Sequence, residues 1–445
     1  MSRPAGFADL AGRRVGIFGY GVEGRATAER LRGVAASLVL VDDAAGLGPD
    51  VLVTTQGGHE QLLTCDVVLK SPGIARRRAD VLDLEAHRVV VTSALNLWLH
   101  DVDRSRVVAI TGTKGKSTTT ALVTFFLHCL GERAQCLGNI GQPPYDPSID
   151  TSSGWLVLEV SSYQCVDLDV APALVVVTSL GADHLDWHGS LAQYQDDKLS
   201  LTRADGPHRT LVPDTAAFRD VTDQLGGAVT FVHADTHLLA SALGLLGSHS
   251  DSNVALALAT VSALTGEPAE KIRALAAAQA STFVPLRGRL TLVASETVNG
   301  QCVRYVDDGL ATAPLPTVAA LEVFADEPVA LIAGGFDRGV DYAPLAEELA
   351  QRRPPTLLLT MGDAGPRIEA AVHDRAPTLA QRAVGSMADA VREARAFLSG
   401  GGVVLLSPGA PSFGQYRNWE ERSDDFTRVV LEFTRQWSLG GDSNP

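Results

Sequence analysis

Short apolar runs alternate with longer segments of helical periodicity along most of this chain. Runs such as 107–110 (VVAI) and 356–361 (TLLLTM) are almost continuously apolar, which is typical of strands buried on both faces of a sheet. Between such runs lie helical segments, among them 118–130, 251–264 and 387–398. This alternation predicts an α/β fold with parallel sheets that are covered by helices on both faces.

The chain has 445 residues, which is too long for one ordinary hydrophobic core. Its pattern predicts three α/β domains, at 1–100, 101–285 and 286–445. The first is a small doubly wound domain, and the second opens with a glycine-rich loop. The stretch 281–290 (STFVPLRGRL) is predicted to be a hinge between the second and third domains. In the third domain, strands and helices again alternate, which predicts another parallel sheet.

Composition narrows the classes of function. The formal net charge is −15 without a basic block, so nucleic acid is not an expected partner. No apolar run reaches the ~18 residues of a membrane span, and the first residues lack the apolar core of a signal peptide. The five cysteines are scattered and odd in number, as expected for reduced thiols. We therefore expect a cytoplasmic globular protein.

The segment 107–120 (VVAITGTKGKSTTT) carries the strongest chemical signal. A buried strand leads into a loop with Gly112 and Gly115, and a helix starts close behind it. Backbone N–H groups of such a loop bind phosphate oxygens, and the helix N-terminus adds positive potential. Lys116 would reach the terminal phosphates, and the Ser117 hydroxyl would bind Mg²⁺. The loop is shorter than a Walker A loop, since Ile110 stands where that pattern has glycine.

A second glycine loop lies near the N-terminus. The strand 15–18 precedes Gly19, Gly21 and Gly24, and Asp42 and Asp43 end the next strand. This G-x-G-x-x-G pattern followed by an acid fits a dinucleotide or any other nucleotide diphosphate. An NAD-dependent oxidoreductase is one alternative, but it leaves the loop at 107–120 unexplained.

The short loop G-T-x-G-K-S-T (112–118) resembles the ATP loop of the Mur ligases, which join amino acids to peptidoglycan precursors. Glu159, which leaves the strand 155–160 and is well placed to bind Mg²⁺, fits the same family, as does the D-H-L-D…Y…K spacing from Asp183 to Lys198. The resemblance implies a Rossmann-like N-terminal domain, a central P-loop ATPase-like domain and a Rossmann-like C-terminal domain. It also implies ATP and two Mg²⁺ ions, with Lys198 carbamylated.

The site residues that the resemblance implies fall into four overlapping groups. The catalytic group is Lys116, Glu159, His184 and Lys198, and the metal ligands are Ser117, Glu159, His184 and carbamylated Lys198. The ATP-binding residues are Gly112, Thr113, Lys114, Gly115, Lys116, Ser117, Thr118, Asn253, Arg289 and Asp308. The substrate-binding residues are Val22, Glu23, Asp42 and Asp43 for the uracil, Ser71 and Gly73 for the pyrophosphate, Asn139 for the sugar–peptide, Thr312, Arg338, Ser412 and Trp419 for the amino acid, and in addition Ser161.

The first domain and the ending SPGAPSFGQYRNWEER are similar to the glutamate-adding branch of the family. The expected substrates are UDP-N-acetylmuramoyl-L-alanine and glutamate, joined through an acyl phosphate by a monomeric ligase of peptidoglycan synthesis. Departures gather on the glutamate side: Leu310 takes the place of a lysine, Gly414 that of an aspartate and Trp419 that of a phenylalanine.

Alongside these departures, the stretches 307–314 (DDGLATAP) and 407–413 (SPGAPSF) resemble the pattern of an L-glutamate-adding variant, whose product another enzyme epimerises. The ordinary D-glutamate-adding ligase is the alternative. A non-catalytic nucleotide-binding regulator on the same scaffold is a third possibility, although a regulator has no need of a carbamylated lysine.

Overall fold

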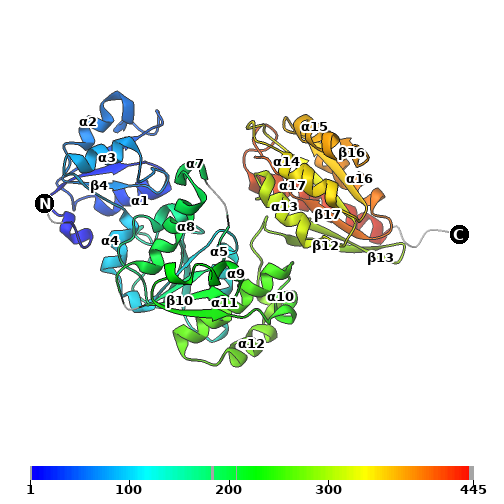
Figure 1. Cartoon of the computed structure of the whole chain (residues 1–445), viewed down its shortest axis with the longest axis horizontal. Helices are drawn as coiled ribbons and strands as arrows, with labels where there is room; N and C mark the ends of the chain where they lie inside the picture. The colour runs from blue at the N-terminus through cyan, green and yellow to red at the C-terminus, as the bar shows by residue number, and fades with distance from the viewer. Residues whose placement is uncertain (1–2, 182–184, 207, 440–445) are drawn as a thin grey trace. The chain divides into compact units, whose positions relative to one another are not determined.

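The computed structural model describes residues 3–181, 185–206 and 208–439. Their contacts form two compact units, Met1–Leu239 with Asp251–Ala280 and Ala240–Ser250 with Ser281–Pro445. The first unit contains two sheets and the second contains a third sheet, whose strands run from green-yellow to orange-red in Figure 1. The predicted α/β segments thus correspond to three sheets, whereas the domain boundaries at 100 and 285 stay predictions. Among the described helices, none combines the length and apolar character that a bilayer crossing requires.

The first sheet has five parallel strands in the order β3-β2-β1-β4-β5. The strand order reverses between β1 and β4, and open α/β sheets bind ligands beyond the carboxyl ends of the strands at such a switch point. The strands are β1 (Arg14–Phe18), β2 (Ser37–Asp42), β3 (Val51–Val53), β4 (Val67–Lys70) and β5 (Val90–Thr92). The helices are α1 (Val22–Leu31), α2 (His59–Leu62), α3 (Ala79–Ala86) and α4 (Ala94–Asp101).

The second sheet has six parallel strands in the order β11-β10-β9-β6-β8-β7. Its strands are β6 (Val107–Thr111), β7 (Ala134–Gly138), β8 (Trp155–Glu159), β9 (Leu174–Val177), β10 (Arg209–Pro213) and β11 (Ala228–Val232). Its helices are α5 (Lys116–Cys129), α6 (Ser162–Cys165), α7 (Leu185–His188), α8 (Leu191–Leu199), α9 (Ala216–Arg219), α10 (His237–Ala242), α11 (Ser248–Thr265) and α12 (Ala269–Ala278). One apolar core joins this sheet to the first, with Trp98 of α4 packed among residues of both.

The third sheet has the order β12-β13-β17-β14-β15-β16. Its strands are β12 (Thr291–Val298), β13 (Gln301–Asp307), β14 (Val329–Gly334), β15 (Thr356–Met361), β16 (Ala380–Ala383) and β17 (Gly402–Leu406). Helices α13 (Pro314–Val323), α14 (Ala343–Gln351) and α15 (Gly365–Arg375) share one core with the sheet. Helices α16 (Met387–Phe397) and α17 (Trp419–Leu439) share a second core, on the other face. The prediction of helices on both faces is therefore confirmed.

The prediction of a wholly parallel third sheet is wrong at one edge. Strand β12 pairs antiparallel with β13, and Asn299 and Gly300 form the two-residue connection. Both residues have positive φ, at 50° and 77°, which matches the twist that a tight hairpin requires. The Asn-Gly pair between two strand-like runs is the sequence signal that identifies this hairpin.

Candidate active site

The loop between β6 and α5 has the predicted order of strand, glycine turn and helix. Gly112 and Gly115 adopt positive φ, at 142° and 86°. A Cβ on Gly112 would lie 2.1 Å from Thr178 Oγ1, and one on Gly115 would lie 2.4 Å from Asn253 Oδ1. Glycine is therefore required at both positions by conformation and by space. The loop leads directly into α5, whose first backbone N–H groups are available to an anion.

Two predicted catalytic lysines converge on this loop. Lys116 Nζ donates to the carbonyl oxygens of Gly112 at 2.9 Å and of Thr113 at 3.1 Å. Lys198 Nζ, whose residue is 1% exposed, donates to the same Gly112 carbonyl at 2.9 Å. Tyr194 lies beneath, with its hydroxyl donating to Thr113 Oγ1 at 3.0 Å. Two side chains that are 82 residues apart in sequence thus meet at one backbone carbonyl of the predicted phosphate loop.

Glu159 lies at the carboxyl end of β8, beside Asn139. Its Oε1 accepts a hydrogen bond from Asn139 Nδ2 at 2.6 Å, and its residue is 1% exposed. Its Oε2 is buried and has no hydrogen-bond partner among the described residues. A buried carboxylate oxygen without a partner is unfavourable unless a cation or donor completes it. The predicted Mg²⁺ ligand therefore has an oxygen that fits a cation.

Two further residues that are predicted to bind the nucleotide or Mg²⁺ lie beside the loop. Ser117 is buried in the first turn of α5, and the buried Asn253 accepts a hydrogen bond from Thr119 at 3.3 Å. His184 lies outside the described residues. Within the described part of the chain, no cluster of three or more His, Cys, Asp or Glu could hold a metal ion. The predicted Mg²⁺ ligands would not form such a cluster, because Ser117 and Lys198 are of other residue types and His184 lies outside the described residues.

At the switch point of the first sheet, the two predicted substrate loops are joined. Ser71 Oγ donates to the Gly19 carbonyl at 2.6 Å. Asp42 accepts from the backbone N–H of Tyr20 at 2.6 Å, which holds the glycine loop to the end of β2. Trp187 Nε1, from the second sheet's α7, donates to the Gly73 carbonyl at 3.2 Å. The predicted pyrophosphate loop is therefore in contact with the half of the unit that contains the ATP loop.

Two further acids predicted to face the uracil already have protein partners. Asp43 pairs with Arg78, and that guanidinium holds the pKa of the carboxyl below its usual value. Glu23 accepts hydrogen bonds at 2.8 Å each from Tyr145 and Gln164, both of the second sheet's half. Burial raises the pKa of Glu23, and these two donors offset only part of the rise. A contact of either residue with the base stays a prediction, as it does for the exposed Val22.

In the second unit, Asp308 and Asp307 end β13 and begin the loop to α13. Ser407 Oγ donates to Asp308 Oδ2 at 2.7 Å. The residue keeps some exposure, but its carboxyl is poorly solvated, and this burial raises the pKa of Asp308 to about 7. The adjacent Asp307 accepts hydrogen bonds from Gly309 N and Ser423 Oγ, while its own burial raises its pKa. The loop is thus built around two carboxyls whose negative charge is unfavourable.

Sequence reasoning missed the role of Arg422. This arginine is 2% exposed and donates to three backbone carbonyls, those of Gly309 and Ala410 at 3.0 Å each and of Gly334 at 3.3 Å. It therefore holds together the three loops on which the predicted amino-acid residues lie. Those residues are Thr312, the exposed Arg338 and the buried Ser412. Burial lowers the pKa of Arg422 to about 10.

Further predicted residues are divided between the two units. The ring of Trp419 packs against Gly288, where a Cβ would lie 2.6 Å from its Cζ3 atom. Arg289 is the next residue along the chain and is exposed. In the first unit, Ser161 caps α6 by accepting from Gln164 N at 3.2 Å, and Lys114 N donates to Ser179 Oγ at 2.8 Å. The binding roles assigned to these residues stay predictions.

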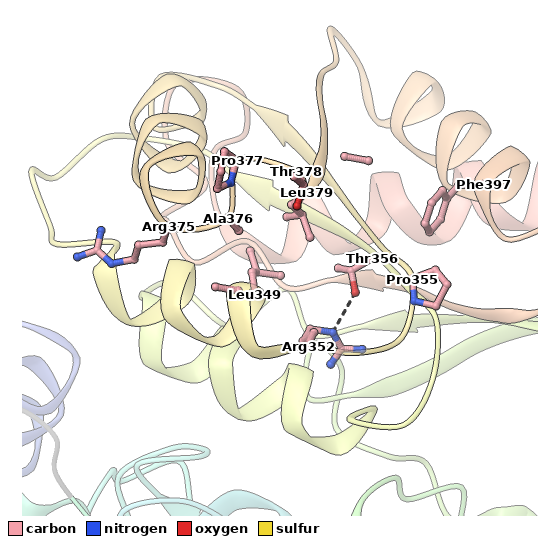
Figure 2. Close-up of a pocket in the computed structure, with 12 residues that line it drawn as sticks. Leu349, Arg352, Pro355, Thr356, Arg375, Ala376, Pro377, Thr378, Leu379 and Phe397 are labelled. Atoms are coloured by element: carbon pink, nitrogen blue, oxygen red, sulfur yellow. Dashed lines mark hydrogen bonds between the residues drawn. The ribbon is translucent and has the colours of Figure 1, made fainter.

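A pocket of about 430 Å³ in the second unit lies at the amino ends of β15 and β16, as Figure 2 shows. It is lined by the ends of α14, α15 and α16 and by the first residues of β15 and β16. The guanidinium of Arg352 in its wall already donates to Thr356 and to the carbonyls of Leu321, Phe324 and Glu327. Because the predicted amino-acid residues follow the carboxyl ends of the strands, this pocket is separate from them.

Comparison with known proteins gives consistent matches. The Mur ligase middle domain family matches residues 110–216. The UDP-N-acetylmuramoyl-L-alanine–L-glutamate ligase of a Micromonospora strain is 38% identical over 458 aligned residues, covering 95% of this chain and 98% of the relative. The protein of the same name from Xanthomonas euvesicatoria is 35% identical over 462 residues, covering 95% and 96%.

Solved structures share the fold at low sequence identity. MurF of Acinetobacter baumannii superposes with a TM-score of 0.54 at 14% identity, covering 93% of each chain. The UDP-N-acetylmuramate–alanine ligase MurC of Thermotoga maritima gives a TM-score of 0.52 at 16% identity, covering 94% of this chain and 99% of the other. These similarities confirm the multi-domain α/β architecture that the sequence predicts.

Proposed function

This chain belongs to the Mur ligase family, and we propose that it joins L-glutamate to UDP-N-acetylmuramoyl-L-alanine at the expense of ATP. Membership in the family makes it an ATP-dependent ligase that forms C–N bonds. The observation that carries the choice of substrates is the similarity over almost the whole chain to ligases named for L-glutamate. A cytoplasmic location belongs to the same proposal, because the five cysteines are free thiols.

The ATP phosphates would be bound by the loop that follows β6. Its backbone N–H groups and the N-terminus of α5 provide donors and positive potential. Lys116 already lies along the loop, bonded to the carbonyls of Gly112 and Thr113, so a short movement of its ammonium would reach a phosphate. There it would stabilise the negative charge on the transferring phosphoryl group.

The site also fits Mg²⁺. Glu159 Oε2 is buried without a hydrogen-bond partner among the described residues, and Ser117 lies buried in the first turn of α5. These two residues would hold the ion, with His184 and Lys198 as the further ligands that family resemblance implies. When bound, Mg²⁺ neutralises charge on crowded phosphate oxygens.

Carbamylation of Lys198 is part of the proposal. Addition of CO₂ to Nζ would convert a cation into an anion while keeping one N–H, which suffices for the bond to the Gly112 carbonyl. It would also remove one of the two ammonium groups that meet at that carbonyl. Lys198 is buried and lies beside a second ammonium group, that of Lys116, at the same carbonyl.

The reaction has two steps. The terminal carboxylate of the L-alanyl group attacks the γ-phosphorus of ATP, which releases ADP and leaves an acyl phosphate. The neutral amine of glutamate then attacks the acyl carbon, loses a proton and expels inorganic phosphate as the amide forms. Water must be kept from the acyl phosphate, which is why ligases of this kind benefit from closure around their substrates.

The amino-acid pocket is proposed at the loops that Arg422 holds together. Thr312, Arg338, Ser412 and the backbone at Trp419 would contact the glutamate. Leu310 stands where the resemblance to D-glutamate enzymes expects a lysine, so one carboxylate of the substrate needs a different partner or a different position. A pocket selects one enantiomer through the positions at which it binds the charged groups of the substrate.

A paired assay tests the proposal. The purified protein, ATP, Mg²⁺ and UDP-N-acetylmuramoyl-L-alanine are incubated with L- or D-glutamate, and phosphate release and ligated product are measured. Product with L-glutamate alone is expected. Product with D-glutamate alone would show that the changes at Leu310 and Trp419 are tolerated variation, and product with neither would overturn the choice of amino acid.

A further inference from the structure

Four polar side chains connect the predicted pyrophosphate loop to the ATP half of the first unit. Arg77, four residues beyond Gly73, donates to both carboxylate oxygens of Asp197, at 2.8 and 3.0 Å. Asp197 Oδ2 is 2.7 Å from His188 Nδ1, and His188 Nε2 is 3.0 Å from Ser162 Oγ. These contacts join the loop before α3, which carries Arg77, to helices α8, α7 and α6. Arg77 and Asp197 are 120 residues apart in the sequence.

Three members of this chain of contacts are buried, and the fourth is not. Ser162, His188 and Asp197 are 4%, 3% and 3% exposed, whereas the side chain of Arg77 is 49% exposed. The buried carboxylate of Asp197 accepts hydrogen bonds from Arg77 on both of its oxygens and a further one from Gln193 at 2.9 Å. These contacts hold the half-exposed arginine of the first sheet's half against α8.

The order serine, histidine and aspartate is that of a nucleophilic triad, but burial excludes that role. Ser162 is the first residue of α6, a single helical turn capped by Ser161, and its Oγ lies inside the protein where a solute could not approach it. The histidine ring is enclosed further by Tyr163, stacked at 5.6 Å between centroids, and by Trp187 at 4.4 Å. The contacts therefore hold elements in place.

The elements that they hold carry both predicted binding sites. On one side, the loop 71–77 contains Gly73, whose carbonyl accepts from Trp187, the neighbour of His188. On the other side, Asp197 directly precedes Lys198, which bonds the Gly112 carbonyl of the ATP loop. A ligand that orders the first loop would thus restrict α8 and, through it, the ATP loop. Figure 1 shows α7 and α8 in green among the elements of this unit.

We propose that Arg77 and Asp197 are positioning residues that couple binding of the nucleotide substrate to binding of ATP. The inference rests on the proposed function, since it needs a nucleotide diphosphate at Gly73 and ATP at the loop after β6. Coupling between two sites is reciprocal, so each ligand should tighten the other by the same factor. Neither residue needs to touch a reacting atom for this effect.

The test replaces Arg77 in the full-length protein and measures binding without turnover. Calorimetry gives the affinity of the non-hydrolysable analogue AMP-PNP, with Mg²⁺, in the absence and presence of UDP-N-acetylmuramoyl-L-alanine. In the wild type we expect the nucleotide substrate to tighten AMP-PNP binding about 5- to 100-fold. In Arg77→Met this factor should fall to near one, with affinity for AMP-PNP alone unchanged. Arg77→Lys, which keeps the charge but loses the two-pronged contact, should be intermediate.

Arg203→Met is the matched control. Arg203 pairs with Asp196, the neighbour of Asp197 on the same helix, at 2.6 Å, but it belongs to the second sheet's half. This variant should keep the wild-type coupling factor. Unchanged coupling in Arg77→Met, or an equal loss in Arg203→Met, would overturn the inference.

Failure of the proposed function would be recognised separately. If the wild type binds neither AMP-PNP nor the nucleotide substrate, the proposed function is wrong. If it binds both and makes product, but the two ligands bind independently, only the coupling role of Arg77 and Asp197 is wrong. Turnover gives a second readout: Arg77→Met should raise the KM values for ATP and the nucleotide substrate and leave that for glutamate unchanged.

Discussion

A buried ion pair between the halves of the first unit leads to a quantitative prediction. Lys70 ends β4 in the first sheet, and Asp167 follows α6 in the second sheet's half. Lys70 Nζ is 2.5 Å from Asp167 Oδ2, and the two side chains are 0% and 1% exposed. Arg76 approaches the other oxygen at 3.6 Å. Asp167→Asn removes the anion and leaves the lysine charged in a place that water does not reach.

The expected loss is about 3–5 kcal/mol of folding free energy, the range found when one partner of a buried pair is removed. Coulomb attraction at 2.5 Å with an effective dielectric constant of about 20 is roughly 6–7 kcal/mol, and desolvation opposes it. That opposition is large here, because burial raises the pKa of Asp167 despite the attraction of Lys70. The net value of the intact pair is therefore small, whereas the penalty for breaking it is large.

Calorimetric unfolding of the full chain measures the effect, with Asp196→Asn as a control at an exposed ion pair. The control should lose at most about 1 kcal/mol. The double variant Lys70→Met/Asp167→Leu removes both charges and should recover most of the stability that Asp167→Asn loses. A loss below about 1 kcal/mol in Asp167→Asn would refute the reasoning. A double variant as unstable as the single one would attribute the loss to packing rather than to an unpaired charge.

Three further predictions concern the ATP loop of the first unit and Asp308 of the second unit. Lys116→Ala should lower product formation at least 100-fold without changing the melting temperature, and near-normal turnover would contradict the role given to this lysine. Glu159→Gln should weaken Mn²⁺ binding, measured by electron paramagnetic resonance with Mn²⁺ in place of Mg²⁺, by about tenfold or more; unchanged binding would remove Glu159 from the ligand set. The pKa of Asp308 is raised from 3.8 to about 7, so the folded state keeps a proton that the unfolded state loses. The stabilising contribution of this proton is complete below about pH 4 and is lost as pH rises to about 7. Asp308→Asn should therefore flatten this part of the stability–pH profile, and an unchanged slope in urea unfolding between pH 4 and 7 would contradict the raised pKa.

Much of the fold could be predicted because its signals are local. Buried strands such as β6 and β15 are continuous apolar runs, and the glycines of the ATP loop are required by their own backbone angles. The Asn299–Gly300 hairpin also has a local signal, but the alternation of strands and helices around it predicts a wholly parallel sheet and conceals the antiparallel edge strand. The family resemblance rested on the same short motifs and is confirmed over 95% of the chain.

The pairing of charged groups could not be predicted in this way. Asp167 and Asp197 look like ordinary acids near helices, and Lys70, Arg76 and Arg77 look like ordinary bases beside a turn. Which base meets which acid depends on how the first sheet packs against the second, through contacts 97 and 120 residues apart in sequence.

Residue order was enough to predict most strands and helices, the phosphate loop and the family, because neighbouring residues largely set local conformation. Only the packing of distant segments brings Lys116 and Lys198 to one carbonyl, leaves Glu159 with an oxygen that has no partner among the described residues, and lets Arg422 join three loops. These features arise when distant segments pack together and water is excluded from charged groups, and residue order alone does not specify the partners.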